Sequence, residues 1–299
     1  MIIIKDSKNL GKVLIKEINR DVAKNIIVKN HYSHKWNTSF GKINIGIFKN
    51  DILLGCASFG NLMNPKSYKN INKDFESKNV IELNRLWIDD ELQKNAESIL
   101  LGACWKILRN DYPYIKVVQS FADGRLGCGT IYKATNFKYY GYTKTLFYYN
   151  TINGDVQHKV PMENTMRPNG FIKLNCQWCK GILKPFYVKT YRYIYPLYKN
   201  VKIDLIEQKY PQYDKGIEYI DDYHHNPMLI FRAYIEAYMF HQNDDANILY
   251  KYIINNFNEN EIIDYMKNGL NNNSINKLSK LKNCSNELNQ LKIQYIKLK

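Results

Sequence analysis

The first third of the chain alternates short apolar runs with amphipathic segments. Apolar residues predict a short strand over residues 2–4, and apolar positions at helical spacing predict a helix over residues 21–28. Two β-rich runs follow at residues 43–48 and 52–59. The three residues between them, Lys49 to Asp51, predict that these runs form an antiparallel hairpin.

The next segments predict the remainder of a sheet. Residues 80–88 alternate as a strand that places Glu82 and Asn84 on one face, and polar residues in a central strand indicate a lined cleft. A helix over residues 95–109, a strand over 115–121, a helix around 130–135 and strands over 138–142 and 145–149 are predicted to follow. This order predicts a mixed α/β sheet flanked by helices. A doubly wound dinucleotide fold would instead show parallel βα units throughout.

From about residue 200 the pattern changes to helix, most clearly at residues 228–240 and 246–257. The tail from residue 275 carries apolar side chains at alternating threes and fours, a coiled-coil-like stripe for which packing on the core is favoured over dimerisation. We therefore predict one domain over residues 1–200 and a helical extension over residues 201–299.

The composition suggests a partner and a compartment. Lys and Arg number 43 against 28 Asp and Glu, and the resulting charge of +15 can attract a polyanion such as nucleic acid. A chain rich in Lys, Asn, Ile and Tyr is also what an A/T-rich genome encodes, so charge alone leaves both interpretations open. No signal peptide and no membrane-length apolar run are visible, and six scattered cysteines fit a reducing compartment. These features predict a cytoplasmic protein that does not enter membranes.

Several polar residues lie at the ends of predicted elements, where side chains can meet in a cleft. His31, Tyr32 and Ser33 precede the hairpin, while Ser120 and Asp123 lie at the end of a strand. An imidazole can act as a base near neutral pH, and a carboxylate can orient it or accept a proton itself. Taken singly, a hydrogen-bonded histidine at a helix end and an aspartate in a turn are the simpler explanations.

A second candidate site opens the helix predicted over residues 95–109. Free backbone N–H groups and the helix dipole receive phosphate at such a position, and small residues let a ligand approach. An ordinary helix start is the alternative. The segment is similar to a degenerate acyl-CoA pyrophosphate loop of the GNAT acetyltransferases, and its residues are Gln93, Lys94, Asn95, Ala96, Glu97 and Ser98.

Five blocks occur together in one order. They are His31-Tyr-Ser33, Glu82-Leu-Asn-Arg85, Lys94-Asn-Ala-Glu-Ser98, Ser120-Phe-Ala-Asp-Gly124 and Gly129-Thr-Ile-Tyr-Lys-Ala-Thr-Asn-Phe137. Over residues 25–200, including Tyr191-Arg-Tyr-Ile-Tyr195 near the end, the chain resembles the Mom family of phage DNA-modification proteins. Two departures are a shorter turn after Asp123 and a C-terminal hundred residues without a counterpart in the family.

The resemblance implies a GNAT-like fold and an enzyme that transfers a carbamoylmethyl group to N6 of adenine in double-stranded DNA. In that family the modification protects phage or mobile-element DNA from restriction. The target base must leave the duplex before it can react. The resemblance implies acyl-CoA as the donor. The new bond is to a CH2 carbon, however, which simple acyl transfer does not explain, so the acyl-CoA site is alternatively a relic.

The resemblance also implies a role for each block. The catalytic set is expected to comprise His31, Tyr32, Ser33, Ser120 and Asp123. Tyr132 is expected to bind the cofactor together with residues 93–98, and Lys35, Asn84, Arg85 and Arg125 are expected to contact DNA. Iron held by His31 and a carboxylate is a less favoured alternative.

Cys176-Gln-Trp-Cys179 is a single short-spaced pair of thiols. His158, His224 or His225 could complete a zinc site with it. Because there is no second pair nearby, two ordinary cysteines on a loop or strand edge are favoured over zinc, and no metal site is predicted.

Two other functions stay open. One is a GNAT acetyltransferase acting on protein or small-molecule amines, which product analysis would separate from a DNA-modifying enzyme. The other is a non-catalytic DNA-binding protein that protects DNA by occupancy, which predicts salt-sensitive binding without a modified base. The sequence assigns no oligomeric state.

Overall fold

The structure is a computed structural model of the 299-residue chain, and it describes residues 1–164, 166–212, 216–258, 260–262 and 264–265. Contacts divide the chain into two compact units. The first unit holds Met1–Thr143 and Lys189–Gly216, and the second holds Lys144–Val188 and the chain from Ile217 onward.

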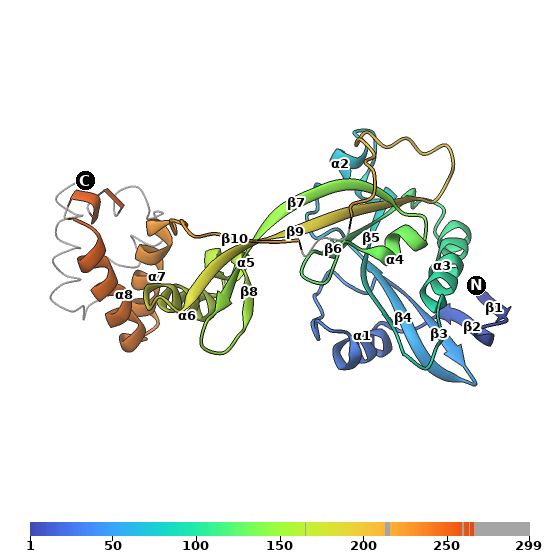
Figure 1. Ribbon diagram of the computed structural model, residues 1–299, viewed down its shortest axis with the longest axis horizontal. Coiled ribbons are helices and arrows are strands. Elements are labelled where there is room, and N and C mark those ends of the chain that lie inside the picture. Colours follow the sequence, from blue (N-terminus) through green and yellow to red (C-terminus); the bar gives the residue numbers. More distant parts are fainter. Residues whose placement is uncertain (165, 213–215, 259, 263, 266–299) are drawn as a thin grey trace. The chain divides into compact units, whose positions relative to one another are not determined.

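The first unit is a sheet with helices packed against it. Its strands follow the order β1-β2-β3-β4-β5-β6-β9-β7, in which β5 and β6 run parallel and the pairs from β1 to β5 are antiparallel. This arrangement confirms the predicted mixed α/β sheet flanked by helices. The elements, in part shared with the second unit, are β1 (Ile2–Ser7), β2 (Gly11–Glu17), α1 (Arg20–Asn30), β3 (Ile43–Lys49), β4 (Ile52–Gly60), α2 (Tyr68–Ile71), a 3-10 turn (Ser77–Asn79), β5 (Val80–Ile88), α3 (Ala96–Asp111), β6 (Val117–Asp123), α4 (Thr130–Ala134), β7 (Lys138–Asn150) and β9 (Leu183–Pro196) (Figure 1).

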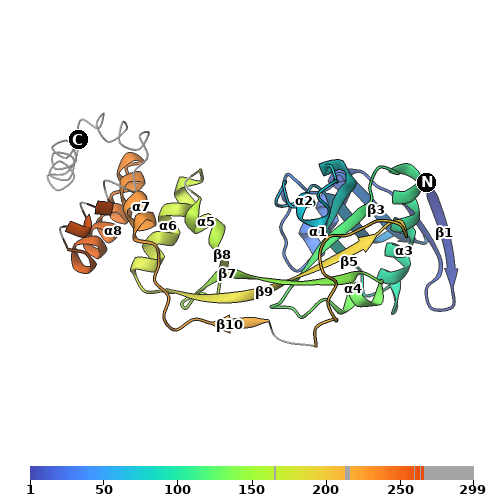
Figure 2. The same cartoon turned by 90° about the horizontal axis from the view of Figure 1, so that it is seen from above.

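The predicted hairpin is confirmed as β3 and β4. Asn50 and Asp51 at its turn both have positive φ, 51° and 62°, which is the backbone of the two-residue turn that matches the twist of paired strands. Ile43, Ile45 and Ile47 of β3 alternate toward one face and are buried there. This face is covered by α3 (Figure 2).

Helix α3 carries the predicted apolar stripe into the core of the first unit. It begins after Asn95 and ends before Pro113, close to the predicted bounds. Its buried residues include Leu100, Ile107 and Trp105, and the Trp105 ring stacks on Tyr195 of β9 with ring centroids 4.5 Å apart. Strand β9, which was not predicted, is therefore fixed to α3 through the core.

Two parts of the predicted sheet differ from the structure. Strand β2 was not predicted, although it contains three consecutive apolar residues, Val13 to Ile15, and it pairs with β1 on one side and β3 on the other. The strands predicted at residues 138–142 and 145–149 are one strand, β7. β7 continues through Gly141, at φ 84°, and through residues 143 and 144, where the sequence suggested a break.

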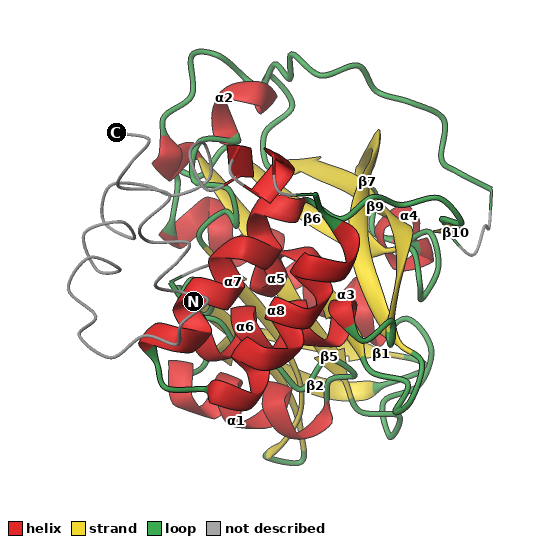
Figure 3. Ribbon diagram, turned by 90° about the vertical axis from the view of Figure 1, so that its left-hand side faces the viewer, coloured by secondary structure: helices red, strands yellow, loops and turns green. Residues whose placement is uncertain are grey.

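The second unit is mainly helical. The predicted helices near residues 228–240 and 246–257 are confirmed as α7 (Pro227–Met239) and α8 (Asn243–Asn256). They pack against α6 (Pro168–Cys179), whose Phe171, Ile172 and Cys176 share their core. The other elements of this unit are β8 (Val156–His158), α5 (Lys159–Glu163) and β10 (Ile217–Tyr219) (Figure 2). Figure 3 shows the helices of this unit, α5 to α8, in red.

The division between the units differs from the predicted boundary at residue 200. Residues 144–188 belong with α7 and α8 because α6 buries its apolar face against those helices. Residues 189–216 return to the first unit, where β9 pairs with β6. The predicted coiled-coil-like stripe from residue 275 lies outside the described residues.

Candidate functional site

A wedge between two parallel strands sets the position of the site. β5 and β6 pair only over Val80–Glu82 and Val117–Gln119, after which β5 continues beside β4 and β6 continues beside β9. Both strands run in the same direction, so their carboxyl ends open the wedge at one edge. Ligands of α/β proteins bind at such an edge, where strand order and pairing change.

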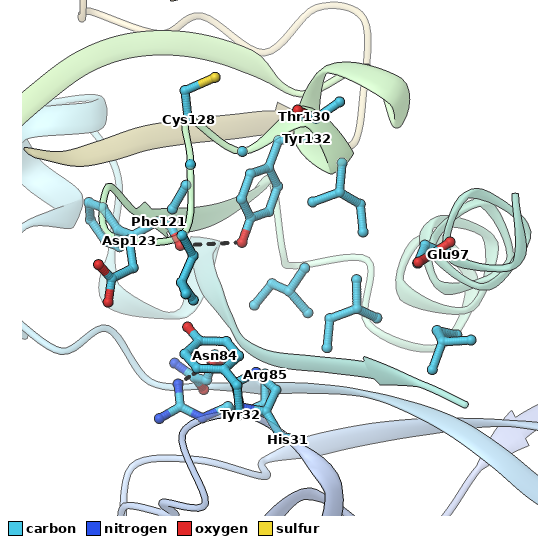
Figure 4. A pocket seen from close by; sticks show the side chains of 18 residues that line it. His31, Tyr32, Asn84, Arg85, Glu97, Phe121, Asp123, Cys128, Thr130 and Tyr132 are labelled. Carbon is cyan, nitrogen blue, oxygen red and sulfur yellow. Dashed lines mark hydrogen bonds between the residues drawn. The ribbon is translucent and has the colours of Figure 1, made fainter. Parts of the chain in front are cut away.

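A pocket of about 400 Å³ lies in this wedge. Figure 4 shows its walls: Phe121 and Asp123 come from β6, Thr130 and Tyr132 from α4, Glu97 from α3, Asn84 and Arg85 from β5, and His31 and Tyr32 from the segment after α1. Four of the five blocks that carry the family resemblance therefore contribute their central residues to one cavity, and the fifth contributes Glu97.

His31 is a neutral histidine in this wall. It is 7% exposed, and burial, followed by the positive charges of Arg85 and His34, lowers its pKa to about 4. The backbone N–H of Ser33 donates to Nδ1 at 3.1 Å, with the Ser33 hydroxyl 2.9 Å from the same nitrogen. Because an amide N–H can only donate, Nδ1 accepts and the ring proton is on Nε2. His31 is thus arranged as a hydrogen-bond donor.

Tyr32 and Arg85 form the neighbouring part of the wall. The Tyr32 ring lies 4.2 Å from the His31 ring, and the residue is 59% exposed. Arg85 stacks over Phe40 at 4.6 Å, and its Nη1 donates to the Asn84 carbonyl at 2.6 Å. Burial lowers its pKa from the usual arginine value. Among the described residues no carboxylate forms an ion pair with Arg85, so this half-buried cation can receive an anion.

Asp123 is held by the turn that follows it. The backbone N–H of Arg125 donates to Asp123 Oδ1 at 3.0 Å, and Arg125 Nε lies 2.9 and 3.0 Å from the two carboxylate oxygens. These contacts orient the carboxylate, which is still part of the pocket wall.

Ser120 and Tyr132 connect the two sides of the wedge. The Ser120 hydroxyl lies 2.9 Å from the Leu83 carbonyl and 2.9 Å from the Tyr132 hydroxyl, which is 3.3 Å from the Phe121 carbonyl. The two carbonyls can only accept, so the hydroxyls donate to them, and only the contact between the two hydroxyls can run in either direction. Burial raises the pKa of Tyr132 to about 12, which keeps it protonated at neutral pH.

Glu82 lies behind Asn84, on the face that the strand alternation predicted. Asn84 Nδ2 donates to Glu82 Oε1 at 3.0 Å, and Gln119 Nε2 lies 3.5 Å from Oε2. Glu82 is 5% exposed, and burial raises its pKa. This buried group fixes the orientation of the Asn84 amide at the pocket wall.

The predicted phosphate loop is only partly at the pocket. Asn95 caps α3 in the left-handed conformation, at φ 75°, and makes no side-chain cap. Of the six residues only Glu97 lines the cavity, and it is a carboxylate in the first turn of the helix. Gln93, Lys94, Asn95, Ala96 and Ser98 do not line the pocket.

The remaining predicted residues contact the wall from outside. Ser33 and Ser120 bind lining residues through the contacts given above, and the Lys35 carbonyl accepts from Arg85 Nε at 3.3 Å. The sequence did not single out the apolar wall. Its members are Leu83, Leu86, Ile88, Phe121, Ala122, Leu126 and Ile131. A large apolar residue among the glycines of residues 124–129 was the available signal for Leu126.

The two short-spaced cysteines lie on a helix, not on the predicted loop or strand edge. Cys176 is buried in α6, and burial raises the pKa of Cys179 to about 12. The described residues contain no group of three His, Cys, Asp or Glu side chains that could hold a metal. In that part of the chain no helix is long and apolar enough to cross a membrane.

Comparisons with known proteins give one family and a group of acetyltransferase structures. The model of the Mom protein family matches residues 12–212. The chain is 31% identical over 187 residues to methylcarbamoylase mom of Escherichia phage Mu, covering 60% of this chain and 74% of that protein. It is similar to a ribosomal-protein-S5-alanine acetyltransferase from Vibrio fischeri, with 9% identity, a TM-score of 0.38 and coverage of 67% and 100% of the two chains. A putative acetyltransferase from Salmonella typhimurium with acetyl-CoA has 12% identity, a TM-score of 0.37 and coverage of 64% and 98%.

Proposed function

The chain belongs to the Mom protein family, and from this membership we propose that it is a transferase that modifies DNA, adding a carbamoylmethyl group to N6 of adenine. The observation that carries the proposal is the pocket in the wedge. Residues from blocks more than a hundred positions apart, such as His31 and Tyr132, line one cavity whose size suits a single base. We further propose that the product protects the modified DNA from restriction.

Charge supports DNA as the partner of the first unit. The excess of Lys and Arg is not spread evenly, because acidic residues outnumber basic ones from Ile217 through α8. The first unit therefore carries most of the positive charge. Arg85 lies at the pocket itself, where phosphates beside an extruded base would pass, and Arg125 adjoins the pocket through its ion pair with Asp123.

We assign the acceptor of the N6 proton to Asp123. Adenine N6 is a weak nucleophile because its lone pair is delocalised into the ring, so removing a proton as the bond forms lowers the barrier. In the proposed step a donor carries a leaving group on CH2. The N6–CH2 bond forms, the bond from CH2 to the leaving group breaks with its electron pair, and the N6 proton moves to the Asp123 carboxylate.

His31 and Tyr32 are proposed to position the base. A neutral His31 with its proton on Nε2 can donate to a ring nitrogen of adenine but has no free lone pair to act as a base. Tyr32 offers an exposed ring on the same wall, and stacking on such a ring stabilises an unpaired base. Asn84, oriented by Glu82, is a further polar group on this wall.

The pocket does not fit acyl-CoA in the manner expected for residues 93–98. Leu86, Ile88 and Ile131 could contact an apolar arm. Glu97, however, places a negative charge in the first turn of α3, where it offsets the helix dipole and would repel a diphosphate. No step is therefore assigned to acyl-CoA, and the donor is defined only by its transferable CH2 group.

The proposal is tested by mass spectrometry of nucleosides from plasmid DNA of cells that express the full chain. We expect deoxyadenosine in which a carbamoylmethyl group replaces one hydrogen. Asp123→Asn keeps the size of the side chain but removes the proton acceptor, so we expect about a hundredfold less product. The same plasmids should be cut by restriction enzymes only when they come from the variant.

The matched control is Asp6→Asn, an exposed aspartate on β1 that does not line the pocket, and it should modify DNA as well as wild type. Unmodified nucleosides with folded wild-type protein would refute the proposed function. Full modification by Asp123→Asn would refute the assigned base alone.

A further inference from the structure

A turn of six residues, 124–129, forms the rim of the pocket between β6 and α4. Leu126 lies in this turn, lines the pocket and is 61% exposed. One exposed leucine needs no special explanation on a protein surface. Leu126 differs from other exposed apolar side chains because it lines the proposed base pocket and directly follows Arg125.

The turn that carries Leu126 is fixed in place. The Leu126 N–H donates to the Asp123 carbonyl at 2.9 Å, and Gly124 N donates to the Lys189 carbonyl at 2.9 Å. The ion pair between Arg125 and Asp123 ties the same turn from its side chains. A side chain projected from a preformed turn loses little freedom when it inserts into a partner.

The cationic side chains near Leu126 are complementary to the phosphates of a DNA backbone beside an unstacked base. Arg125 precedes it in the turn, and Arg85 lies across the pocket from β6, on β5. Proteins that distort DNA combine such cations, which hold phosphates, with an aliphatic side chain that enters between base steps.

We propose that Leu126 is a wedge that enters the base stack as adenine moves into the pocket. It occupies the space the base leaves and prevents the opposite thymine from pairing again. This inference rests on the proposed function, and it identifies the substrate as duplex DNA with a paired target base.

Tyr32 is the other large exposed side chain at the pocket mouth. Its ring packs on His31 at 4.2 Å, which holds it against the pocket wall. That position suits stacking on the extruded base, and it leaves Leu126, which comes from the turn after β6, for the gap in the duplex.

The test begins with permanganate, which oxidises unstacked thymines, applied to plasmid fragments bound by the purified full chain. This assay needs neither a donor nor a known target sequence. Wild type should expose thymines at discrete sites, and Leu126→Ala should expose few or none. Leu126→Met, which keeps a long aliphatic side chain, should restore the exposed thymines.

Duplexes built around these sites separate insertion from general contact. Against a paired adenine we expect Leu126→Ala to bind about tenfold more weakly than wild type, because the cost of opening the pair is no longer offset. Opposite an abasic position the base is already unpaired, and the two proteins should bind within about threefold of each other. Ile4→Ala is the matched control, since Ile4 is 59% exposed on edge strand β1 and lies outside the pocket.

Three results would overturn the wedge. The first is equal thymine exposure by Leu126→Ala and wild type, and the second is an equal loss of affinity by Leu126→Ala for the paired and the abasic duplex. The third is that Tyr32→Ala, and not Leu126→Ala, loses thymine exposure and binds only the paired duplex more weakly. Melting temperatures of all variants should match, because the changed side chains are exposed. If wild type exposes thymines that Leu126→Ala does not, but adenine gains no mass in cells, the wedge stands and the proposed chemistry fails.

Discussion

At the scale of single residues, the site depends on side chains whose protonation is set by burial. His31 and His225 lie in different units, and burial lowers the pKa of each to about 4. His31 accepts a hydrogen bond from the Ser33 N–H, whereas His225 Nε2 contacts Asn175 Oδ1 at 2.9 Å. Both rings are neutral at physiological pH, so neither can supply a positive charge to DNA.

This state predicts a pH dependence of stability. The unfolded chain binds a proton at each histidine near pH 6.5, whereas the folded chain resists protonation until about pH 4. The contribution of each histidine is therefore complete above pH 6.5 and is lost as the pH falls toward 4, at roughly 1 kcal/mol per pH unit or less. Urea unfolding at several pH values should show a shallower slope for His31→Gln than for wild type.

The control for this prediction is His224→Gln, because the His224 side chain is 92% exposed and does not contribute to the lowered pKa of His31; the slope should match wild type. Ring resonances of His31 that titrate near pH 6.5 in the folded protein would contradict the assignment.

The residues of the site were easier to predict than their arrangement. His31, Tyr32, Asn84, Arg85, Asp123 and Tyr132 were expected from sequence blocks and do line one pocket. Their hydrogen bonds depend on local backbone geometry that the residue types do not specify. The Ser33 N–H at Nδ1, which makes His31 a donor, is one such contact.

At the scale of elements, the turn after β6 couples the sheet to the pocket. A Cβ added at Gly124 would clash with the Lys189 carbonyl oxygen and would meet the Gly216 oxygen at 3.1 Å. Both neighbours are backbone atoms, so the turn rather than a side chain must move. Any such movement displaces Arg125 and Leu126 together.

We therefore expect Gly124→Ala to lower DNA modification about tenfold or more, although residue 124 does not line the pocket, and to lower the free energy of unfolding by roughly 1–3 kcal/mol. Nucleoside mass spectrometry and urea unfolding check the two effects. Gly102→Ala is the control, because nothing lies within 4 Å of its added Cβ and alanine favours the helix by about 1 kcal/mol. Wild-type activity in Gly124→Ala would show that the turn tolerates displacement.

Local patterns predicted the elements that local forces determine. The β3–β4 hairpin, β5 and α3 follow from alternation, turn residues and an apolar stripe, and their bounds agree closely with the sequence. The wedge could not be predicted in this way, since it arises where β5 stays with β4 while β6 pairs with β9, which begins 60 residues after β6 ends. Pairing between such distant strands depends on the whole sheet rather than on any segment.

At the scale of the whole molecule, the chain crosses between its two units more than once. The first unit is completed by residues 189–216, and Val201, Ile203 and Leu205 of that return pack against its buried residues. The second unit is completed by α7 and α8, which cover the apolar face of α6. A boundary at residue 200 divides the segment 189–216 that completes the first unit, and it removes α7 and α8 from the second unit.

A chain ending at residue 200 should therefore fail to fold as an independent domain. It would expose Phe171, Ile172 and Cys176 of α6 and lose the three apolar residues of the return, and each large apolar side chain contributes about 1.5–3 kcal/mol when buried. Their sum is comparable with the roughly 5–15 kcal/mol that stabilises a typical domain. Size-exclusion chromatography should find aggregate, with stronger binding of a hydrophobic dye than the full chain shows.

A chain ending at residue 216 separates the two causes, because it keeps the return to the first unit and loses only residues 217–299, which include α7 and α8. Its first unit should fold and melt in a cooperative transition, but the chain should remain prone to aggregation through the exposed apolar face of α6. If the chain ending at residue 200 were instead monomeric and melted like the full protein, the first unit would not need its return. Folding would then be local to residues 1–200, and α6 would have to bury its apolar face without α7 and α8.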